Sequence, residues 1–355
     1  MKSDFDILDI LLRQYKLFNG NLLVAKQDKI IYTGSFGYTN GEKQNNLIDG
    51  NTIFELASVS KQFTAYSTLI TFKKLNESID NDIRNYLPDF PYEGLTARNL
   101  LNHTSGLPDY FKLLNLHWDK TKIATNKDVL ELLIKEKPNP NFLPGENWEY
   151  SNTGYVLLPI LLEIISGNTF SQILDEEIFK LLDMKNSLVL NRRWKPKEIS
   201  NYAYGFVLNS KNHKFESPDN LTEYNSVIYM DGIQGDGTVN STVFDLLKWN
   251  IEIIEAKRLD KFSVDLMLVN ASISNNQKID YGMGWMLNDA KEFGRVAYHG
   301  GYWPGYSTYN SIYLDKGFSI ISLCNQPQNL ETEQQIILAL ENITLDKSYE
   351  LPNKG

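Results

Sequence analysis

The chain has 355 residues, of which 42% are apolar and 22% are charged, and this composition excludes a protein that is disordered throughout. Its net charge of −9 argues against a broad binding surface for nucleic acid or anionic lipid, so we expect a small-molecule or peptide partner. At roughly 100–200 residues per domain, the length fits either two domains or one interleaved fold.

The single cysteine, Cys324, excludes an intrachain disulfide framework and any zinc site built from cysteines. Because it follows a strand-like apolar run, we interpret Cys324 as a packing residue rather than a nucleophile. The most apolar stretch, 155–165, is shorter than the roughly 20 residues that span a bilayer, so we expect no membrane span. Residues 1–6 lack the apolar core of a signal peptide, which fits either a cytosolic protein or a mature form.

Three elements are predicted in the first part of the chain. Apolar residues recur at helical spacing over 3–18 and stop at Asn19-Gly20, which indicates an amphipathic helix. The apolar runs 21–26 and 29–36 flank a two-residue turn and predict a β-hairpin. A longer helix is predicted over 58–75.

Helical patterns then alternate with long polar loops as far as about residue 240, and convincing strands are few there. Two more helices are predicted, over 242–256 and 330–343. Between them lie four strand-like runs separated by turn residues, as in an antiparallel meander: 282–287, 295–299, 306–314 and 318–325.

These elements predict an α+β fold. The simplest assembly joins the N-terminal hairpin to the C-terminal meander in one antiparallel sheet, flanked by the terminal helices. The sheet domain is then discontinuous, with residues 1–80 and 240–355, and a mainly helical domain spans 81–239. We expect the active site in the cleft between the two domains.

The chain contains one Ser-x-x-Lys motif, Ser58 to Lys61, at the start of a predicted helix. Residues three apart share a helix face, so the Lys61 amine can reach the Ser58 hydroxyl and take or share its proton. The helix N-terminus also favours the negative charge that develops on a carbonyl oxygen under attack. The alternative is a surface serine and lysine in the first turn of an ordinary helix. The motif alone therefore does not identify a catalytic site, and further motifs are needed.

A Tyr-x-Asn motif at Tyr150 and Asn152 is the second motif of the candidate site. A nearby ammonium such as that of Lys61 favours the phenolate form of a tyrosine, so Tyr150 could relay the serine proton. Asn152 offers an amide donor and acceptor for both Lys61 and a substrate amide. A second Tyr-x-Asn at 38–40 is interpreted as a turn, which shows that this pattern alone is not specific.

A third motif, His299-Gly300-Gly301, ends one of the strand-like runs. Paired glycines let another backbone approach a strand closely, and His299 could donate a hydrogen bond or carry charge near neutral pH. The alternative is a glycine-rich turn with a structural histidine. We interpret His103 as a packing and hydrogen-bonding residue, and no spacing indicates a metal site or a cofactor.

In this order the motifs resemble the penicillin-recognising serine hydrolase superfamily, in the branch of class C beta-lactamases, DD-peptidases, D-amino-acid peptidases and family VIII-type esterases. The resemblance covers nearly the whole chain. It extends to four further segments: 54–57 before the serine, 100–107, 142–145 and 235–237. It implies the beta-lactamase/transpeptidase-like fold.

The resemblance also implies roles for the three motifs. Ser58 would be the acylated nucleophile, and Lys61 and Tyr150 would form the proton-transfer pair, with the base left undecided between them. Asn152 would position Lys61 and the substrate.

The strand element would supply the rest of the site. His299, Gly300 and Gly301 would stand where beta-lactamases have Lys-Thr-Gly, and the N–H groups of Ser58 and Tyr302 would form the oxyanion hole.

The departures from the family pattern carry the substrate information. His299 is less reliably charged than a lysine and Gly300 has no hydroxyl, which weakens the case for penicillin hydrolysis and for release of C-terminal D-alanine. Arg295 either supplies a carboxylate contact or is a solvated strand residue. Three aromatic residues either form a rim for the substrate or pack in the core: Tyr302, Trp303 and Tyr306.

We expect the segment 192–229 to shape specificity. It carries six aromatic residues: Trp194, Tyr202, Tyr204, Phe206, Tyr224 and Tyr229.

The leading hypothesis is a metal-free serine acyl hydrolase that acts on an ester, or on an amide containing a small or D-amino acid. The alternative enzyme is a beta-lactamase or D-Ala-D-Ala carboxypeptidase. A different class of protein would be a sensor that binds cell-wall fragments or beta-lactams without turnover. The family places the protein in the periplasm or outside the cell, with the cytoplasm as the alternative.

Overall fold

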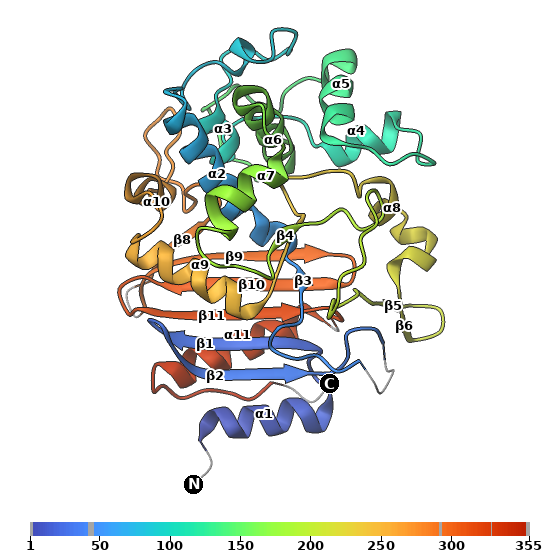
Figure 1. Cartoon of the computed structure of the whole chain (residues 1–355), viewed down its shortest axis with the longest axis vertical. Helices are drawn as coiled ribbons and strands as arrows, with labels where there is room; N and C mark the ends of the chain where they lie inside the picture. The colour runs from blue at the N-terminus through green and yellow to red at the C-terminus, as the bar shows by residue number, and fades with distance from the viewer. Residues whose placement is uncertain (1–2, 42–45, 291–292, 328, 353–355) are drawn as a thin grey trace.

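The computed structural model describes residues 3–41, 46–290, 293–327 and 329–352. Six antiparallel strands among these residues form one sheet with the order β2-β1-β11-β10-β9-β8 (Figure 1). The strands are β1 (Gly20–Lys26), β2 (Lys29–Phe36), β8 (Met286–Ala290), β9 (Gly294–Trp303), β10 (Tyr306–Tyr313) and β11 (Phe318–Cys324). The predicted union of the N-terminal hairpin with the C-terminal meander is confirmed, since β1 pairs with β11 along its whole length.

The two faces of the sheet pack against different helices because side chains alternate along each strand. Leu22 and Val24 join a core cluster with α1 (Asp4–Tyr15) and α11 (Leu330–Thr344). Their neighbours Leu23 and Ala25 join the larger cluster on the opposite face, which includes buried residues of α9 (Val243–Glu255). Figure 1 shows α9 in front of the sheet and α11 behind it.

Helix α1 ends earlier than its periodicity predicts. It stops at Tyr15, and Lys16 takes the left-handed conformation that ends a helix, with φ 50°. Asn19 does not act as a stop signal. Instead its side chain donates to the Tyr38 carbonyl and to Asn325 Oδ1, which joins the hairpin to the end of β11.

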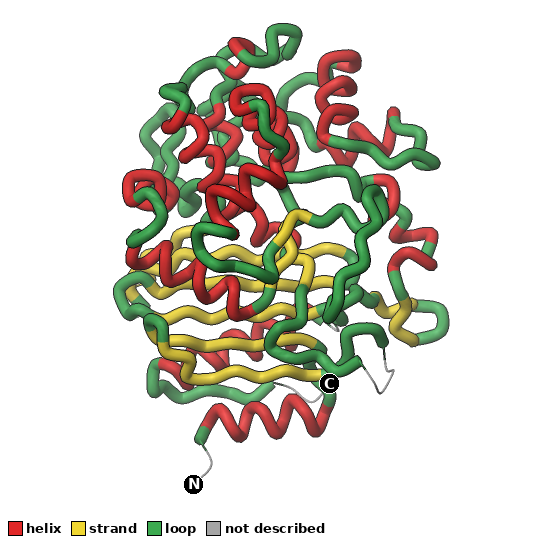
Figure 2. Tube along the Cα trace, in the orientation of Figure 1, coloured by secondary structure: helices red, strands yellow, loops and turns green. Residues whose placement is uncertain are grey.

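A helical layer lies above the sheet in the tube view (Figure 2). The same large core cluster runs from the sheet into this layer without a break. The helices are α2 (Lys61–Lys74), α3 (Ala97–Leu101), α4 (Tyr110–His117), α5 (Asn126–Glu136), α6 (Asn152–Ser166), α7 (Phe170–Leu174), α8 (Ser226–Tyr229) and α10 (Lys261–Met267). Shorter turns are η1 (Ala57–Ser60), η2 (Ile83–Asn85), η3 (Asp175–Phe179), η4 (Pro218–Asn220) and η5 (Thr222–Tyr224).

Short strands connect the two layers. The strands β3 (Phe54–Glu55), β7 (Val239–Ser241) and β4 (Leu188–Val189) form a small sheet in the order β3-β7-β4. One part of the region predicted to contain long polar loops forms a hairpin instead, of β5 (Val207–Asn209) and β6 (Lys214–Glu216). Strand β8 starts at Met286 rather than at 282, because the Gly282 N–H donates to the Trp285 carbonyl and closes a turn there.

Within the described residues, no single helix has the length and hydropathy needed to cross a membrane. Asn152–Ser166 and Phe170–Phe179 reach that threshold only as a pair, and they meet at a bend of 85°.

Candidate active site

The Ser-x-x-Lys motif forms the join between η1 and α2. Ser58 lies in the 3-10 turn, half-buried, and Lys61 is the first residue of α2 and fully buried. The Lys61 Nζ donates to Ser58 Oγ at 3.1 Å and to the Asp236 main-chain oxygen at 2.8 Å. The sequence predicts the first of these contacts, and burial of the amine with two oxygen acceptors makes the pair an integral part of the core.

The segment 235–239 is held against α2 by side chains of that helix and its lead-in turn. Thr64 Oγ1 donates to the Gly235 carbonyl at 2.6 Å, and Ser60 Oγ accepts from the Val239 N–H at 3.0 Å. These bonds place the Asp236 carbonyl over Lys61. The Gly-Asp-Gly motif at 235–237 belongs to the family resemblance, but no local pattern in the sequence indicates its contact with the lysine.

The Tyr-x-Asn motif approaches the same lysine from the start of α6. The Tyr150 ring centroid lies 5.1 Å from Lys61 Nζ, within cation–π distance. Asn152 begins α6 and lines the same cavity as Ser58. In the part of the chain that the structure describes, Lys61 is hydrogen-bonded by Ser58 and Asp236, and the expected bond from Asn152 to Lys61 is not formed.

His103 packs against the ring of Tyr150. The two ring centroids are 4.4 Å apart, and His103 Nδ1 accepts the Ser151 N–H at 3.1 Å. Burial, reinforced by the charge of Lys61, holds the pKa of His103 well below its usual range, so the ring is neutral. His103 is therefore a packing and hydrogen-bonding residue, as its sequence context indicates.

His299 lies on β9, with its ring centroid 6.0 Å from that of Tyr150. Burial lowers the pKa of His299 to about 3, and the positive charge of Lys61 contributes to this shift. Because a carbonyl only accepts, Nδ1 carries the proton and donates to the Gly300 oxygen at 2.7 Å, which leaves Nε2 to accept from the Tyr281 hydroxyl at 3.3 Å. The expectation that His299 could carry charge near neutral pH is therefore wrong.

The two glycines after His299 differ in their surroundings. A Cβ on Gly301 would lie 2.4 Å from the Leu56 carbonyl oxygen and 3.0 Å from the Ser58 nitrogen, whereas a Cβ on Gly300 would meet only the Thr308 oxygen, at 3.9 Å. Gly301 is thus required for the close approach of β9 to the Ser58 turn. Gly300 leaves open space where a side chain would fit.

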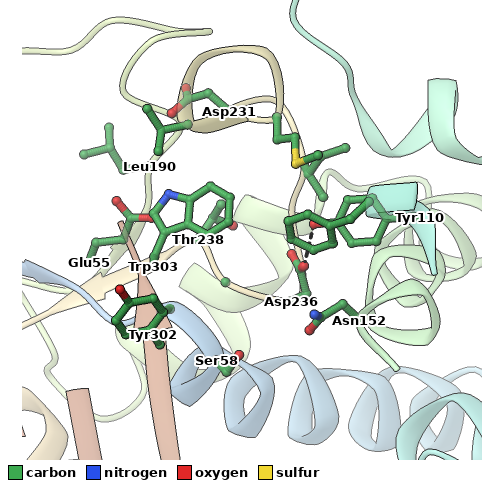
Figure 3. Close-up of a pocket in the computed structure, with 16 residues that line it drawn as sticks. Glu55, Ser58, Tyr110, Asn152, Leu190, Asp231, Asp236, Thr238, Tyr302 and Trp303 are labelled. Carbon is green, nitrogen blue, oxygen red and sulfur yellow. Dashed lines mark hydrogen bonds between the residues drawn. The ribbon is translucent and has the colours of Figure 1, made fainter. Parts of the chain in front are cut away.

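A cavity with an empty volume of about 580 Å³ opens beside Ser58 (Figure 3). One of its walls carries Asp236, whose Oδ2 accepts from the Tyr110 hydroxyl at 2.9 Å. Burial raises the pKa of Asp236, and the Lys61 charge opposes this shift. Two more carboxylates line the cavity, those of Glu55 and Asp231, and burial raises the pKa of Glu55 to about 7.

A second hollow, an open groove, meets the site on the side of Tyr150. It is lined by Tyr150 and Asn152 together with residues of the α4 region, among them Asp109, Lys112 and Leu113. Ser58 does not line this groove, and Tyr150 does not line the cavity of Figure 3. A third hollow, along β9, is lined by both Ser58 and Tyr150 together with His299, Gly300 and Gly301. Ser58 therefore borders the cavity of Figure 3 and the hollow along β9, whereas Tyr150 borders that hollow and the open groove.

Two expectations can be resolved, one about the three aromatic residues and one about Arg295. Tyr302 and Trp303 line the cavity, but Tyr306 is buried and donates to the Ala203 carbonyl at 2.8 Å, so it packs in the core. Arg295 donates to the Leu268 carbonyl and lies 4.0 Å from Asp289, and it lines neither hollow. It is a half-buried strand residue, not a carboxylate contact of the site.

The aromatic residues expected to shape specificity lie elsewhere. None of the six between 194 and 229 lines the cavity, and Tyr202 and Tyr229 are buried in the core. The end of this segment and the residues just after it contribute aliphatic and acidic groups instead: Val227, Met230, Asp231 and Ile233. Among the described residues, no cluster of three His, Cys, Asp or Glu side chains has the arrangement of a metal site.

Comparisons with known proteins agree with this architecture. The Beta-lactamase family model matches residues 6–342. Penicillin-binding protein 4* of Bacillus subtilis is 41% identical over 337 residues, which cover 95% of this chain and 74% of that protein. A D-aminopeptidase of Gluconobacter oxydans is 24% identical over 90% of this chain and 58% of its own length. The crystal structure of a penicillin-binding protein from Bacillus halodurans has the same fold, with a TM-score of 0.79 at 23% identity, covering 96% of this chain and 99% of that one.

Proposed function

Because this chain belongs to the beta-lactamase family and is a serine hydrolase, we propose that it works through an acyl-enzyme on Ser58. Its substrate is an ester, or an amide that contains a small or D-amino acid. The name of the Gluconobacter oxydans relative, a D-aminopeptidase, supports the second class of substrate.

The proposed reaction has two halves. Ser58 Oγ attacks the substrate carbonyl carbon, and its proton passes to the pair formed by Lys61 and Tyr150. The oxyanion accepts hydrogen bonds from the N–H groups of Ser58 and Tyr302, where each such donor contributes about 10²–10³ in rate. Collapse breaks the bond to the leaving group, which receives the proton and departs. Water then attacks the Ser58 ester, releases the acid and restores the hydroxyl.

The observation that carries this proposal is the bond between Lys61 Nζ and Ser58 Oγ at 3.1 Å. A serine hydroxyl is a weak nucleophile at its ordinary pKa and needs an adjacent group that accepts its proton. Lys61 is fully buried and donates one of its hydrogen bonds to the half-buried Ser58. This burial argues against an ordinary surface pair.

The test is covalent labelling by a fluorophosphonate, a reagent that traps activated serines. The intact mass of the parent should increase by a single adduct, and the Ser58→Ala variant should show none. The same variant should lose hydrolysis of nitrophenyl butyrate. An unlabelled but folded parent, or a Ser58→Ala variant that hydrolyses the ester as fast as the parent, would remove Ser58 from the mechanism.

The neutral His299 bears on the alternative enzyme, a beta-lactamase or D-Ala-D-Ala carboxypeptidase. Such substrates carry a carboxylate, and neither His299 nor Gly300 offers a positive charge or a hydroxyl to it. Turnover of nitrocefin or of a D-Ala-D-Ala peptide well above that of simple esters would favour this alternative. Stoichiometric labelling by beta-lactams without turnover of any ester or amide would instead favour a sensor.

A further inference from the structure

The hollows at the site differ in whether Tyr150 lines them, and under the proposed function this difference assigns the two parts of the substrate. The Lys61–Tyr150 pair gives its proton to the leaving group, so the leaving group lies on the side of Tyr150. The open groove and the hollow along β9 are both lined by Tyr150 and fit that part of the substrate. The cavity of Figure 3 is lined by Ser58 but not by Tyr150, so it takes the acyl group.

The lining of the acyl cavity combines apolar and polar groups in similar measure, and one part of it is acidic. Aliphatic and aromatic side chains form its apolar part: Phe111, Leu190, Val227, Met230, Ile233 and Trp303. Figure 3 shows Glu55 on the Trp303 and Leu190 side of the cavity, with Asp236 on the opposite side next to Tyr110. No Lys, Arg or His of the described chain is part of this lining.

The carboxylates of the lining differ in their partners. Asp236 accepts the Tyr110 hydroxyl at 2.9 Å. Asp231 is paired with the Arg193 guanidinium at 2.9 Å and accepts the N–H groups of Arg193 and Trp194. Glu55 accepts no hydrogen bond and lies within ion-pair distance of no cation among the residues that the structure describes.

The nearest positive charge does not satisfy Glu55. Arg193 acts on Glu55 through space, but its guanidinium is already bonded to Asp219 and Asp231. Glu55 is half-buried in the cavity wall, and burial raises its pKa to about 7. A carboxylate in this position, with no cation of the described chain bonded to it, can pair with a cation of the substrate.

We propose that the cavity binds an acyl group made of an aliphatic chain that ends in an ammonium, with the ammonium paired to Glu55. The apolar walls contact the chain, and the carboxylate recognises the terminal charge. The proposal rests on the acyl-enzyme function described above and names its substrate class.

The experiment compares two nitrophenyl esters of equal length, 6-aminohexanoate and heptanoate, which differ only in the terminal ammonium or methyl group. At pH 8 the parent should prefer the ammonium ester by about 10- to 100-fold in kcat/KM, since a hydrogen bond to a charged group is one of the stronger kinds. Glu55→Gln should bring the ratio near one, chiefly by lowering kcat/KM for the ammonium ester. Glu223→Gln changes an exposed carboxylate outside the cavity and should keep the preference.

The outcomes separate this inference from the proposed function. Ser58-dependent hydrolysis of heptanoate without a preference for the ammonium ester, or a preference that survives Glu55→Gln, would overturn the inference alone. Failure of both esters together with absence of fluorophosphonate labelling would overturn both proposals. If circular dichroism shows that Glu55→Gln does not fold, the ratio of kcat/KM for the two esters in the parent still tests the proposal. A parent that does not prefer the ammonium ester has no ammonium site.

Discussion

The α-carbon of Gly301 faces the backbone nitrogen of Ser58 so closely that a methyl group on it would lie 3.0 Å from that nitrogen. The same methyl would lie 2.4 Å from the Leu56 carbonyl oxygen, and neither backbone atom can rotate away. Gly301→Ala should therefore push β9 away from the Ser58 turn. A displacement of about 1 Å at a reacting group costs on the order of 100-fold in rate, which we expect in kcat for nitrophenyl butyrate.

Gly300→Ala is the matched comparison. It adds the same methyl one residue earlier on β9, where the nearest heavy atom would be 3.9 Å away, and it should lose far less activity. Thermal unfolding of both variants separates a displaced site from a lost fold. Equal losses of activity in the two variants would show that the distance between Gly301 and Ser58 is not what limits the rate.

Lys61→Met should slow acylation of Ser58 by about 10²–10⁴, the usual contribution of a positioned acid or base. Methionine keeps most of the buried volume but removes the amine that bonds Ser58 Oγ and the Asp236 carbonyl. The measurement is the second-order rate of fluorophosphonate labelling, which reports acylation without the later steps.

Lys73→Met is the control for that prediction. Lys73 belongs to the same helix but is about half exposed and pairs with Asp260 at 2.6 Å on the surface. Its loss should leave the labelling rate unchanged. A Lys61→Met variant that labels as fast as Lys73→Met would assign the proton transfer to another group.

The sequence anticipates the parts of the site that depend on local geometry. The reach of Lys61 to Ser58 follows from three-residue spacing in a helical turn. The union of the hairpin at one chain end with the meander at the other follows from apolar runs bounded by turn residues, because two such units bury their faces best when joined in one sheet.

What the sequence does not anticipate depends on contacts between distant segments. The neutrality of His299 results from burial against Tyr281 and the charge of Lys61, which come from other elements. The Asp236 carbonyl reaches Lys61 across 175 residues, and no local pattern indicates that bond. The predicted end of α1 is also wrong. Asn19-Gly20 is a common stop signal, but Lys16 takes the left-handed conformation three residues earlier and ends the helix there.

Tyr110→Phe should lower the free energy of unfolding by about 1–3 kcal/mol, because it leaves a buried carboxyl without its side-chain partner. Tyr110 donates to Asp236 Oδ2 at 2.9 Å, and both side chains are buried. This hydrogen bond also holds the pKa of Asp236 down against burial, so the carboxyl should take up a proton more readily in the variant. Urea unfolding at neutral pH measures the loss.

Tyr229→Phe provides the comparison for Tyr110→Phe. Tyr229 is equally buried, but its hydroxyl donates at 3.0 Å to the neutral amide of Asn115. Its loss should cost less than that of Tyr110, because bonds to ionised groups are stronger than bonds between neutral groups. A larger loss for Tyr229→Phe would show that Asp236 gains little from the Tyr110 hydroxyl.

His299 and Glu55 should give opposite pH dependences of stability. In the unfolded chain His299 binds a proton below its ordinary pKa of 6.5, whereas in the folded protein it stays neutral down to about 3. The unfolded state therefore binds more protons in this window, and the free energy of unfolding falls as the pH drops from 6.5 towards 3. Replacing the ring by a group that does not titrate, as in His299→Asn, should remove this contribution. The variant's loss of unfolding free energy relative to the parent should therefore shrink as the pH falls.

Glu55 behaves in the opposite way, because its folded pKa of about 7 lies above its ordinary value of 4.5. The folded state then binds the extra proton, and Glu55→Gln should gain stability relative to the parent as the pH rises from 4.5 to 7. Urea unfolding midpoints of the parent and the two variants at pH 5 and pH 7.5 measure both trends. If the difference between each variant and the parent were the same at the two pH values, neither pKa would be shifted by burial.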